Sequence, residues 1–199
     1  MGYAYTTYQS LRTGLRNSRA VRNASNRLRD EWAQQKAPLK FNTRIGLHYG
    51  EDIVGNVGAA DRFNYTMVGD TVNVVSRLEG ANKTYKTNII VSDALLKQLE
   101  HEQAAHRFAF RMIGKVTMKG KSKSTIIYEL YDQRCSLRLP QIEALDAWNR
   151  VMKQAIYQGN HAAFDHLVAE SEDLSAHPLL IQLRQDLDIS AQSIQRTTT

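Results

Sequence analysis

The sequence contains a single cysteine, Cys135, among its 199 residues. One thiol excludes an internal disulfide bond and any zinc site that is built from several cysteines. This cysteine usage is typical of proteins in a reducing compartment, so we expect a cytoplasmic location.

The sequence also lacks long apolar runs. No window approaches the roughly 18 consecutive apolar residues that a membrane-spanning helix needs. Residues 1–18 have no apolar core ahead of their arginines, as a secretory signal peptide would have. We therefore expect no membrane span in this chain, and an anchor in a longer parent protein stays open.

Positive charge exceeds negative charge, with 26 Lys and Arg against 20 Asp and Glu, which gives a formal net charge of +6. Much of the excess lies in one helix-like segment, at Arg12, Arg16, Arg19, Arg22, Arg27 and Arg29. Aromatic residues are not interleaved with these arginines, as they are in surfaces that stack on bases. We therefore expect no nucleic-acid partner.

Periodicity and breaker residues divide the chain into four segments. We expect a basic amphipathic helix in residues 1–38, a mixed domain in 39–134, a helical extension in 141–190 and a frayed polar tail in 191–199. The extension has the pattern of a helical hairpin, and this pattern resembles a single tetratricopeptide-like unit. A single unit of this kind needs a neighbour to bury its apolar face.

The middle segment mixes strand and helix patterns. Alternating residues predict a hairpin of two strands over residues 39–57, and helical spacing follows from Asp70 to Asn82. Further expected elements are a strand at 88–91, a helix opened by Ser92, and strands at 108–116 and 125–131. This order predicts an α+β fold, with helices flanking a sheet.

The helix from Asp70 to Asn82 carries the most informative polar pair. Asn73 and Arg77 are four residues apart, so their side chains share one face. We expect the apolar face, with Val72, Val75 and Leu78, to be turned away from them. An amide and a guanidinium held on a rigid helix suit a sugar oxygen and a phosphate whose charge rises in a transition state.

Several segments together resemble the class III adenylate and guanylate cyclases. They are Arg44 to Gly50 (RIGLHYG), Val54 to Gly58 (VGNVG), Arg62 to Glu79 (RFNYTMVGDTVNVVSRLE) and Lys119 to Lys121 (KGK). The resemblance implies that residues 39–134 are the carboxy-terminal half of a cyclase catalytic domain. The implied fold is an incomplete ferredoxin-like sheet with flanking helices, followed by the C-terminal helical hairpin.

The resemblance also implies roles for four residues. Asn73 would position the ribose and Arg77 would stabilise the pentavalent phosphorus during cyclisation. Lys119 would reach the terminal phosphates, and Thr66 would read the purine edge. A hydroxyl at this position favours ATP over GTP, because many guanylate cyclases that resemble this chain have a cysteine there.

The half of the domain that carries the metal-binding carboxylates in this family has no counterpart before Arg44. We therefore expect Mg²⁺ or Mn²⁺ to come from a partner or from that missing half, and we assign no metal ligand here. The family's sites form in head-to-tail dimers, so this chain alone is expected to be inactive. Two alternatives stay open: a non-catalytic pseudo-subunit that pairs with an intact cyclase, and an interaction module built on the helical tail.

Three other polar features have simpler interpretations. His48 is expected to be a hydrogen-bonded core residue rather than a general base. Asp70 is expected to stabilise the start of its helix rather than to bind metal. Glu79 and Lys83, four residues apart, are expected to form a surface ion pair.

Overall fold

The computed structural model describes residues 3–4, 8–35, 42–59, 62–117, 124–158, 162 and 164–166. Within these ranges the side chains of residues 3–4, 8–10, 53–59 and 62–68 are not described. The chain divides into two units, residues 1–82 with 88–105, and residues 83–87 with 106–199. Each unit is considered by itself below.

Parallel strands form the centre of the first unit. Strand β2 (Ile45–His48) pairs in parallel with β1 (Tyr3–Ala4) on one side and with β5 (Ile89–Ser92) on the other. Every residue of β5 is buried. A strand buried along its whole length is continuously apolar rather than alternating, which explains the run Ile89, Ile90 and Val91.

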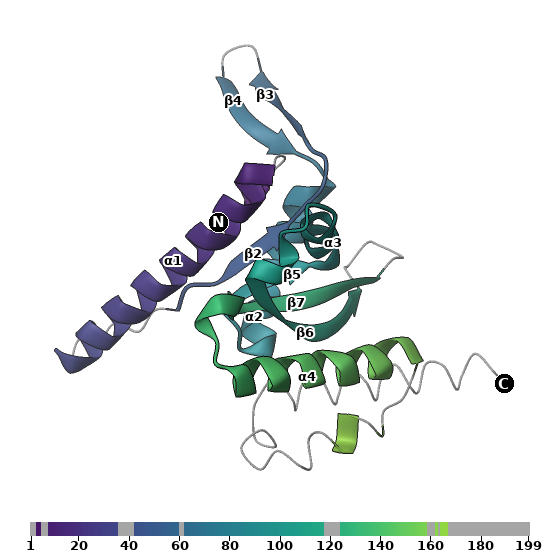
Figure 1. Cartoon of the computed structure of the whole chain (residues 1–199). Helices are drawn as coiled ribbons and strands as arrows, with labels where there is room; N and C mark the ends of the chain where they lie inside the picture. The colour runs from purple at the N-terminus through teal and green to yellow at the C-terminus, as the bar shows by residue number, and fades with distance from the viewer. Residues whose placement is uncertain are drawn as a thin grey trace. The chain divides into compact units, whose positions relative to one another are not determined.

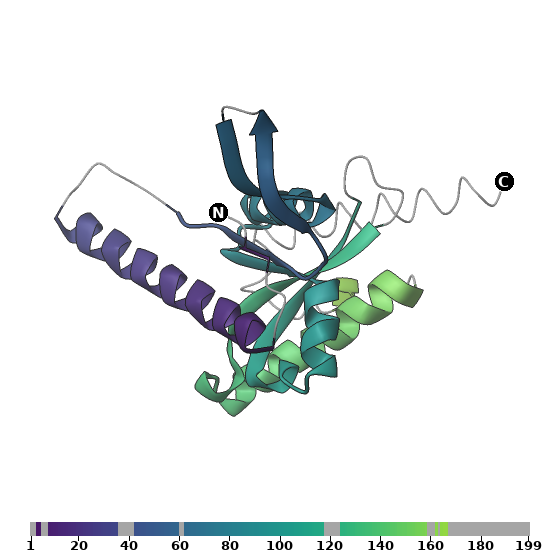
Figure 2. The same ribbon diagram turned by 90° about the horizontal axis from the view of Figure 1, so that it is seen from above.

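The hairpin of the first unit lies elsewhere than the sequence predicted. Strand β3 (Ile53–Ala59) pairs with β4 (Arg62–Val68), in a register that matches Ile53 with Val68 and Ala59 with Arg62. This hairpin projects away from β2 and β5 (Figures 1 and 2). The predicted hairpin over residues 39–57 is therefore wrong. Alternation identifies an extended segment, but it does not identify the strand that pairs with it.

Three helices accompany these strands: α1 (Tyr8–Gln34), α2 (Asp70–Tyr85) and α3 (Asp93–His101). Helix α1 has the expected position, and its buried side chains lie in its first half, where Leu11 and Leu15 are each 1% exposed. Its second half exposes Val21 and Leu28 and extends past the strands (Figure 1). Ser92 caps α3 by accepting a hydrogen bond from the Leu95 amide, as expected.

The second unit is built from one antiparallel pair of strands and a long helix. Strand β6 (Phe108–Thr117) follows a 3-10 turn, η1 (Ala105–Arg107), and pairs with β7 (Ser124–Gln133). A second 3-10 turn, η2 (Arg134–Ser136), leads to helix α4 (Leu139–Gln158), which packs on β6. The predicted strands and the first helix of the extension are therefore confirmed.

The described part of the C-terminal extension continues beyond α4 for a few residues only. Ala162 and residues 164–166 are helical, and the buried ring of Phe164 meets Trp148 edge-on at a centroid distance of 6.5 Å. The rest of the expected helical hairpin and the tail after residue 190 lie outside the described residues. The expected α+β class, with strands flanked by helices, is confirmed.

Candidate functional site

Helix α2 presents one buried face and one polar face. Val74, Val75 and Leu78 are 4%, 4% and 1% exposed, and Asn73 and Arg77 are exposed. One part of the prediction is wrong, because Val72 is 41% exposed and Val74 replaces it in the core. Val74 lies four residues before Leu78 and so on the same line of the helix, whereas Val72 falls at the rim of the buried arc.

The polar side chains of α2 at Asn73 and Arg77 are exposed. Among the described residues, neither Asn73 nor Arg77 makes a hydrogen bond or an ion pair. Their positions four residues apart place both side chains on the same side of the helix, one turn from each other. An unpaired guanidinium and an unpaired amide together offer several donors and one acceptor to a sugar and a phosphate.

The helix begins at a tightly packed turn. Asp70 is the first residue of α2, and Gly69 precedes it. A β-carbon at Gly69 would run into the carboxylate of Asp52, so this turn accepts no larger side chain without a shift. Thr71 is 4% exposed, and its hydroxyl donates to the carbonyl of Glu51 at 3.4 Å. The loop after β2 therefore packs closely against the first turn of α2.

The structure gives less information on the two predicted substrate contacts. Thr66 lies in β4 opposite Gly55, and its side chain is not described. Lys119 falls between β6 and β7, outside the described residues. The phosphate role of Lys119 and the base role of Thr66 therefore stay predictions.

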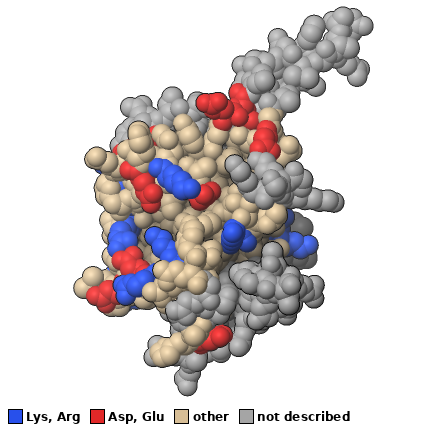
Figure 3. Space-filling view, turned by 90° about the vertical axis from the view of Figure 1, so that its right-hand side faces the viewer, with Lys and Arg blue, Asp and Glu red and all other residues tan. Residues whose placement is uncertain are grey.

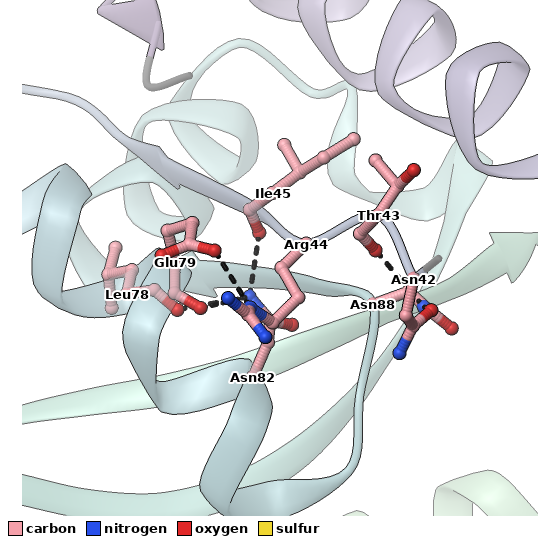
Figure 4. A network of polar contacts seen from close by, with 8 residues as sticks. All are labelled: Asn42, Thr43, Arg44, Ile45, Leu78, Glu79, Asn82 and Asn88. Atoms are coloured by element: carbon pink, nitrogen blue, oxygen red, sulfur yellow. Dashed lines mark hydrogen bonds and ion pairs between the residues drawn. The ribbon is translucent and has the colours of Figure 1, made fainter. Parts of the chain in front are cut away.

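Sequence reasoning missed the contacts that hold α2 against β2, shown in Figure 4. Glu79 pairs with Arg44 at 2.8 Å rather than with Lys83 as predicted. The amide nitrogen of Asn82 donates to the carbonyl of Ile45 at 3.0 Å. One signal in the sequence could have indicated the role of Asn82. This residue falls on the same helical face as Val75 and Leu78, so a polar side chain there is expected to be buried.

His48 lies at the end of β2 and is half-buried. Its Nδ1 is 2.6 Å from the hydroxyl oxygen of Ser92, which is completely buried. Ser92 also caps α3, so His48 belongs to the contacts that join the ends of β2 and β5 to that helix. This is the structural position expected for His48.

Side chains that commonly bind metal ions do not form a cluster of three or more among the described residues. Within these residues, no three His, Cys, Asp or Glu side chains gather closely enough to hold a metal ion.

Lys and Arg side chains are interspersed with Asp and Glu on the face drawn in Figure 3, so the excess positive charge forms no single patch there. Across the described ranges, the helices are all too short or too polar to cross a membrane.

Comparison with known proteins relates this geometry to a family. Residues 17–131, more than half of the chain, match the model of the adenylate and guanylate cyclase catalytic domain. Over 99 residues the chain is 45% identical to adenylate cyclase 1 of Rhizobium meliloti, covering 49% of this chain and 14% of that protein. Over 114 residues it is 33% identical to an adenylate cyclase of Anabaena cylindrica, covering 55% of this chain and 22% of that protein.

A solved structure shows the same fold. A bacterial light-regulated adenylyl cyclase superposes with a TM-score of 0.51 at 21% identity, covering 73% of this chain and 40% of that chain. The chain spans less than a quarter of the length of the two curated relatives described above. The match over residues 17–131 shows that the chain belongs to the adenylate and guanylate cyclase catalytic domain family.

Proposed function

We propose that this chain contributes the nucleotide-orienting half of a cyclase active site that makes cyclic AMP from ATP. The observation that carries the proposal is the exposed and unpaired Asn73 and Arg77 on one face of α2, in a chain of the cyclase family. The two curated relatives are named adenylate cyclases, which supports ATP as the substrate.

In the proposed reaction, the ribose 3'-hydroxyl attacks the α-phosphorus of the nucleotide. A new oxygen–phosphorus bond forms, the bond to the pyrophosphate oxygen breaks, the hydroxyl proton passes to solvent water, and pyrophosphate leaves with the electron pair. Asn73 holds the ribose by its amide so that the hydroxyl stays in line with the phosphorus. Arg77 faces the phosphorus oxygens, where negative charge grows in the transition state.

Lys119 and Thr66 complete the proposed substrate contacts. The ammonium of Lys119 is a mobile point charge that suits the terminal phosphates. The hydroxyl of Thr66 both donates and accepts hydrogen bonds, and so suits the edge of adenine. The support for these two assignments is the position of each residue in the family pattern, Lys119 beside Gly120 and Thr66 seven residues before Asn73.

The metal requirement of the reaction points to a second polypeptide half. The proposal assigns no metal ligand to this chain, and no group of three or more His, Cys, Asp or Glu side chains gathers among the described residues. In this proposal Mg²⁺ or Mn²⁺ would be held by carboxylates of a partner domain, and the ion would neutralise charge on the polyphosphate. We propose that the partner is a cyclase domain in a head-to-tail dimer and that this chain alone makes no cyclic nucleotide.

A complementation assay tests the proposal. The full chain is mixed with a cyclase catalytic domain that keeps its metal carboxylates but has lost its own asparagine and arginine. With Mg²⁺ or Mn²⁺ and ATP, cyclic AMP should form in the mixture and in neither component alone. Asn73→Ala or Arg77→Ala should lower turnover by about 10²-fold or more and leave nucleotide affinity less affected.

Arg150→Ala is a matched control, since Arg150 is an exposed helical arginine on α4. Its turnover should equal that of the unaltered chain. Robust cyclic AMP production by the chain alone would show that the metal assignment is wrong. Binding to the partner without any gain in turnover would favour the role of a non-catalytic pseudo-subunit. If the chain neither binds the partner nor raises turnover, the interaction module built on the helical tail is favoured.

The base assignment has a separate test. Substituting Thr66 with Cys or Ala in the complemented dimer should change the ratio of ATP to GTP turnover. An unchanged ratio, at unchanged protein stability, would remove Thr66 from base recognition. The ratio is the useful readout because a general loss of folding lowers both rates together.

A further inference from the structure

The buried side of α2 is held to the backbone of β2 by an amide that no cyclisation step uses. Asn82 is 1% exposed, and its Nδ2 donates to the carbonyls of Ile45 at 3.0 Å and Leu78 at 3.0 Å. It also lies 3.2 Å from the carbonyl of Glu79 (Figure 4). One side chain therefore joins the helix backbone to the first residue of the strand.

The strand end of this bridge is itself fixed. The amide of Ile45 donates to the carbonyl of Asn88 at 2.8 Å, and Ile45 is paired with Ile89 in the register of β5. The Asn88 side chain donates to the carbonyl of Thr43 at 3.2 Å. Asn82 is therefore bonded to a backbone that neighbouring residues hold in place, rather than to a free loop.

An ion pair adds a second tie between the same elements. Arg44 Nε lies 2.8 Å from Glu79 Oε1, and the two side chains are 37% and 31% exposed. A half-exposed pair adds little stability by itself. The pair instead restrains the orientation of α2. Glu79 and Asn82 lie on the same side of the helix, and together their contacts resist rotation of α2 on β2.

Close backbone packing removes the remaining freedom between strand and helix. A β-carbon on Gly46 would lie 2.5 Å from the Val75 carbonyl oxygen and 2.7 Å from the Glu79 amide nitrogen. Strand and helix therefore approach at van der Waals distance without a side chain between them. A helix seated this closely moves only if its polar ties are released.

The anchored face and the exposed face belong to one rigid element. Asn82 is five residues after Arg77, and at about 100° per residue the two side chains point in clearly different directions. A shift or rotation of α2 on β2 therefore moves Asn73 and Arg77 together. Misplacement of a reacting group by about 1 Å can cost on the order of 10²-fold in rate.

We infer that Asn82, assisted by the Arg44–Glu79 pair, is a positioning residue that sets where Asn73 and Arg77 meet the nucleotide. This inference rests on the proposed function of those two residues. Asn82 touches no substrate. It acts through the register of α2 on β2, so its loss should lower turnover more than nucleotide affinity.

The test is Asn82→Ala in the full chain, measured in the complemented dimer. Turnover per folded molecule should fall by about 10-fold or more, with a smaller change in KM. Folded fraction is read from a urea unfolding curve of each variant. Because Asn82→Ala also destabilises the chain, Gln103→Gly is added in a second variant to recover stability.

Gln103 suits this purpose because it follows α3 in the chain and has a φ of 54°. Glycine adopts this left-handed conformation without the penalty of a β-carbon. The Asn82→Ala/Gln103→Gly variant should regain part of the lost urea resistance but not turnover per folded molecule. Recovery of turnover together with stability would show that Asn82 is only structural and would overturn the inference.

A milder pair of variants keeps the test valid if Asn82→Ala fails to fold. Glu79→Ala removes the ion pair and should lower turnover by about twofold to fivefold, the change in rate that corresponds to the usual energy of a half-exposed pair. Glu79→Gln keeps an oxygen that accepts from Arg44 and should restore most of that loss. Equal turnover in Glu79→Ala and the unaltered chain would contradict the role of the pair.

Hydrogen exchange distinguishes failure of this inference from failure of the proposed function. In Asn82→Ala/Gln103→Gly, amides of residues 74–82 should lose protection while amides of α3 keep theirs. If the unaltered chain supports no turnover at all, the proposed function is wrong, and the predicted loss of turnover in Asn82→Ala is wrong as well. If turnover is supported but α2 protection and turnover are both unchanged, only the inference fails.

Discussion

Helices α2 and α4 are each tied to the backbone of a strand by one asparagine, but the two ties differ. Asn82 of α2 donates to a carbonyl of β2. Asn149 of α4 accepts from the Met112 amide at 2.7 Å and donates to the Phe110 carbonyl at 2.8 Å. The Asn149 side chain therefore bonds to β6 as a neighbouring strand would, with both a donor and an acceptor.

The comparison separates anchoring from function. Helix α4 has further attachments, since Trp148 donates to the Met112 carbonyl at 2.7 Å and Arg134 forms two hydrogen bonds with Asp146. Helix α2 carries the exposed Asn73 and Arg77 on the face that is not tied to β2. The bonds between a helix and a strand thus fix the position of the helix. The side chains on its exposed face decide whether the helix can bind a ligand.

The largest effect on stability should come from breaking the tie of α4. Asn149→Ala leaves the Met112 amide and the Phe110 carbonyl without their partner, at a cost of about 2–3 kcal/mol in the free energy of unfolding. Urea unfolding followed by the fluorescence of the buried Trp148 measures the loss. Turnover per folded molecule in the complemented dimer should stay unchanged, in contrast to Asn82→Ala. A fall in that turnover would break the distinction between the two helices.

A smaller effect is expected from a wedge between α2 and β2. Gly46→Ala brings a methyl group within 2.5 Å of the Val75 carbonyl oxygen, so strand and helix must separate. We expect a loss of about 1–3 kcal/mol, as in other overpacked interiors, together with lower turnover per folded molecule. Gly80→Ala is the matched control for stability, because a β-carbon at Gly80 meets nothing within 4 Å. Unchanged stability in Gly46→Ala would show that the two elements are less closely seated.

The smallest effect should come from the ion pair before α4. Arg134 and Asp146 are 2.6 Å apart and 37% and 46% exposed, so Arg134→Gln should cost less than about 1 kcal/mol at low salt and almost nothing at high salt. The hydrogen bonds that Arg134 donates to the Asp146 carboxylate raise the pKa of Arg134 above its ordinary value. A raised pKa stabilises the fold below the ordinary pKa of the group, so this contribution is fully present at neutral pH and is lost only in strong alkali. A titration of unfolding free energy against salt, at constant pH, checks the expectation.

Local patterns predicted most of the elements. Helical spacing located α1, α2 and α4, the serine cap located the start of α3, and strand patterns located β5, β6 and β7. These patterns arise from contacts within a few residues, which the sequence displays directly. The exposure of Asn73 and Arg77 followed from the same spacing.

Long-range pairing was less accessible. Glu79 forms its ion pair with Arg44, which lies 35 positions earlier in the chain. Nothing in the sequence near Glu79 favours Arg44 over Lys83 as its partner. The pairing of β3 with β4 was missed for the same reason, because an extended segment can pair with any strand that the fold brings beside it. Lys119 and the Thr66 side chain lie outside what the structure describes, so these two predictions stay as they were.

The contacts between α4 and β6 bear on where this chain can be shortened. The family match ends at residue 131, eight positions before α4 begins, yet Trp148 and Asn149 supply three hydrogen bonds to the bulged stretch of β6. A chain cut at Tyr131 would leave that backbone and the surface under Trp148 open to water and to other molecules. The packed structure therefore extends beyond the end of the family match, and a shortened chain for expression should keep α4.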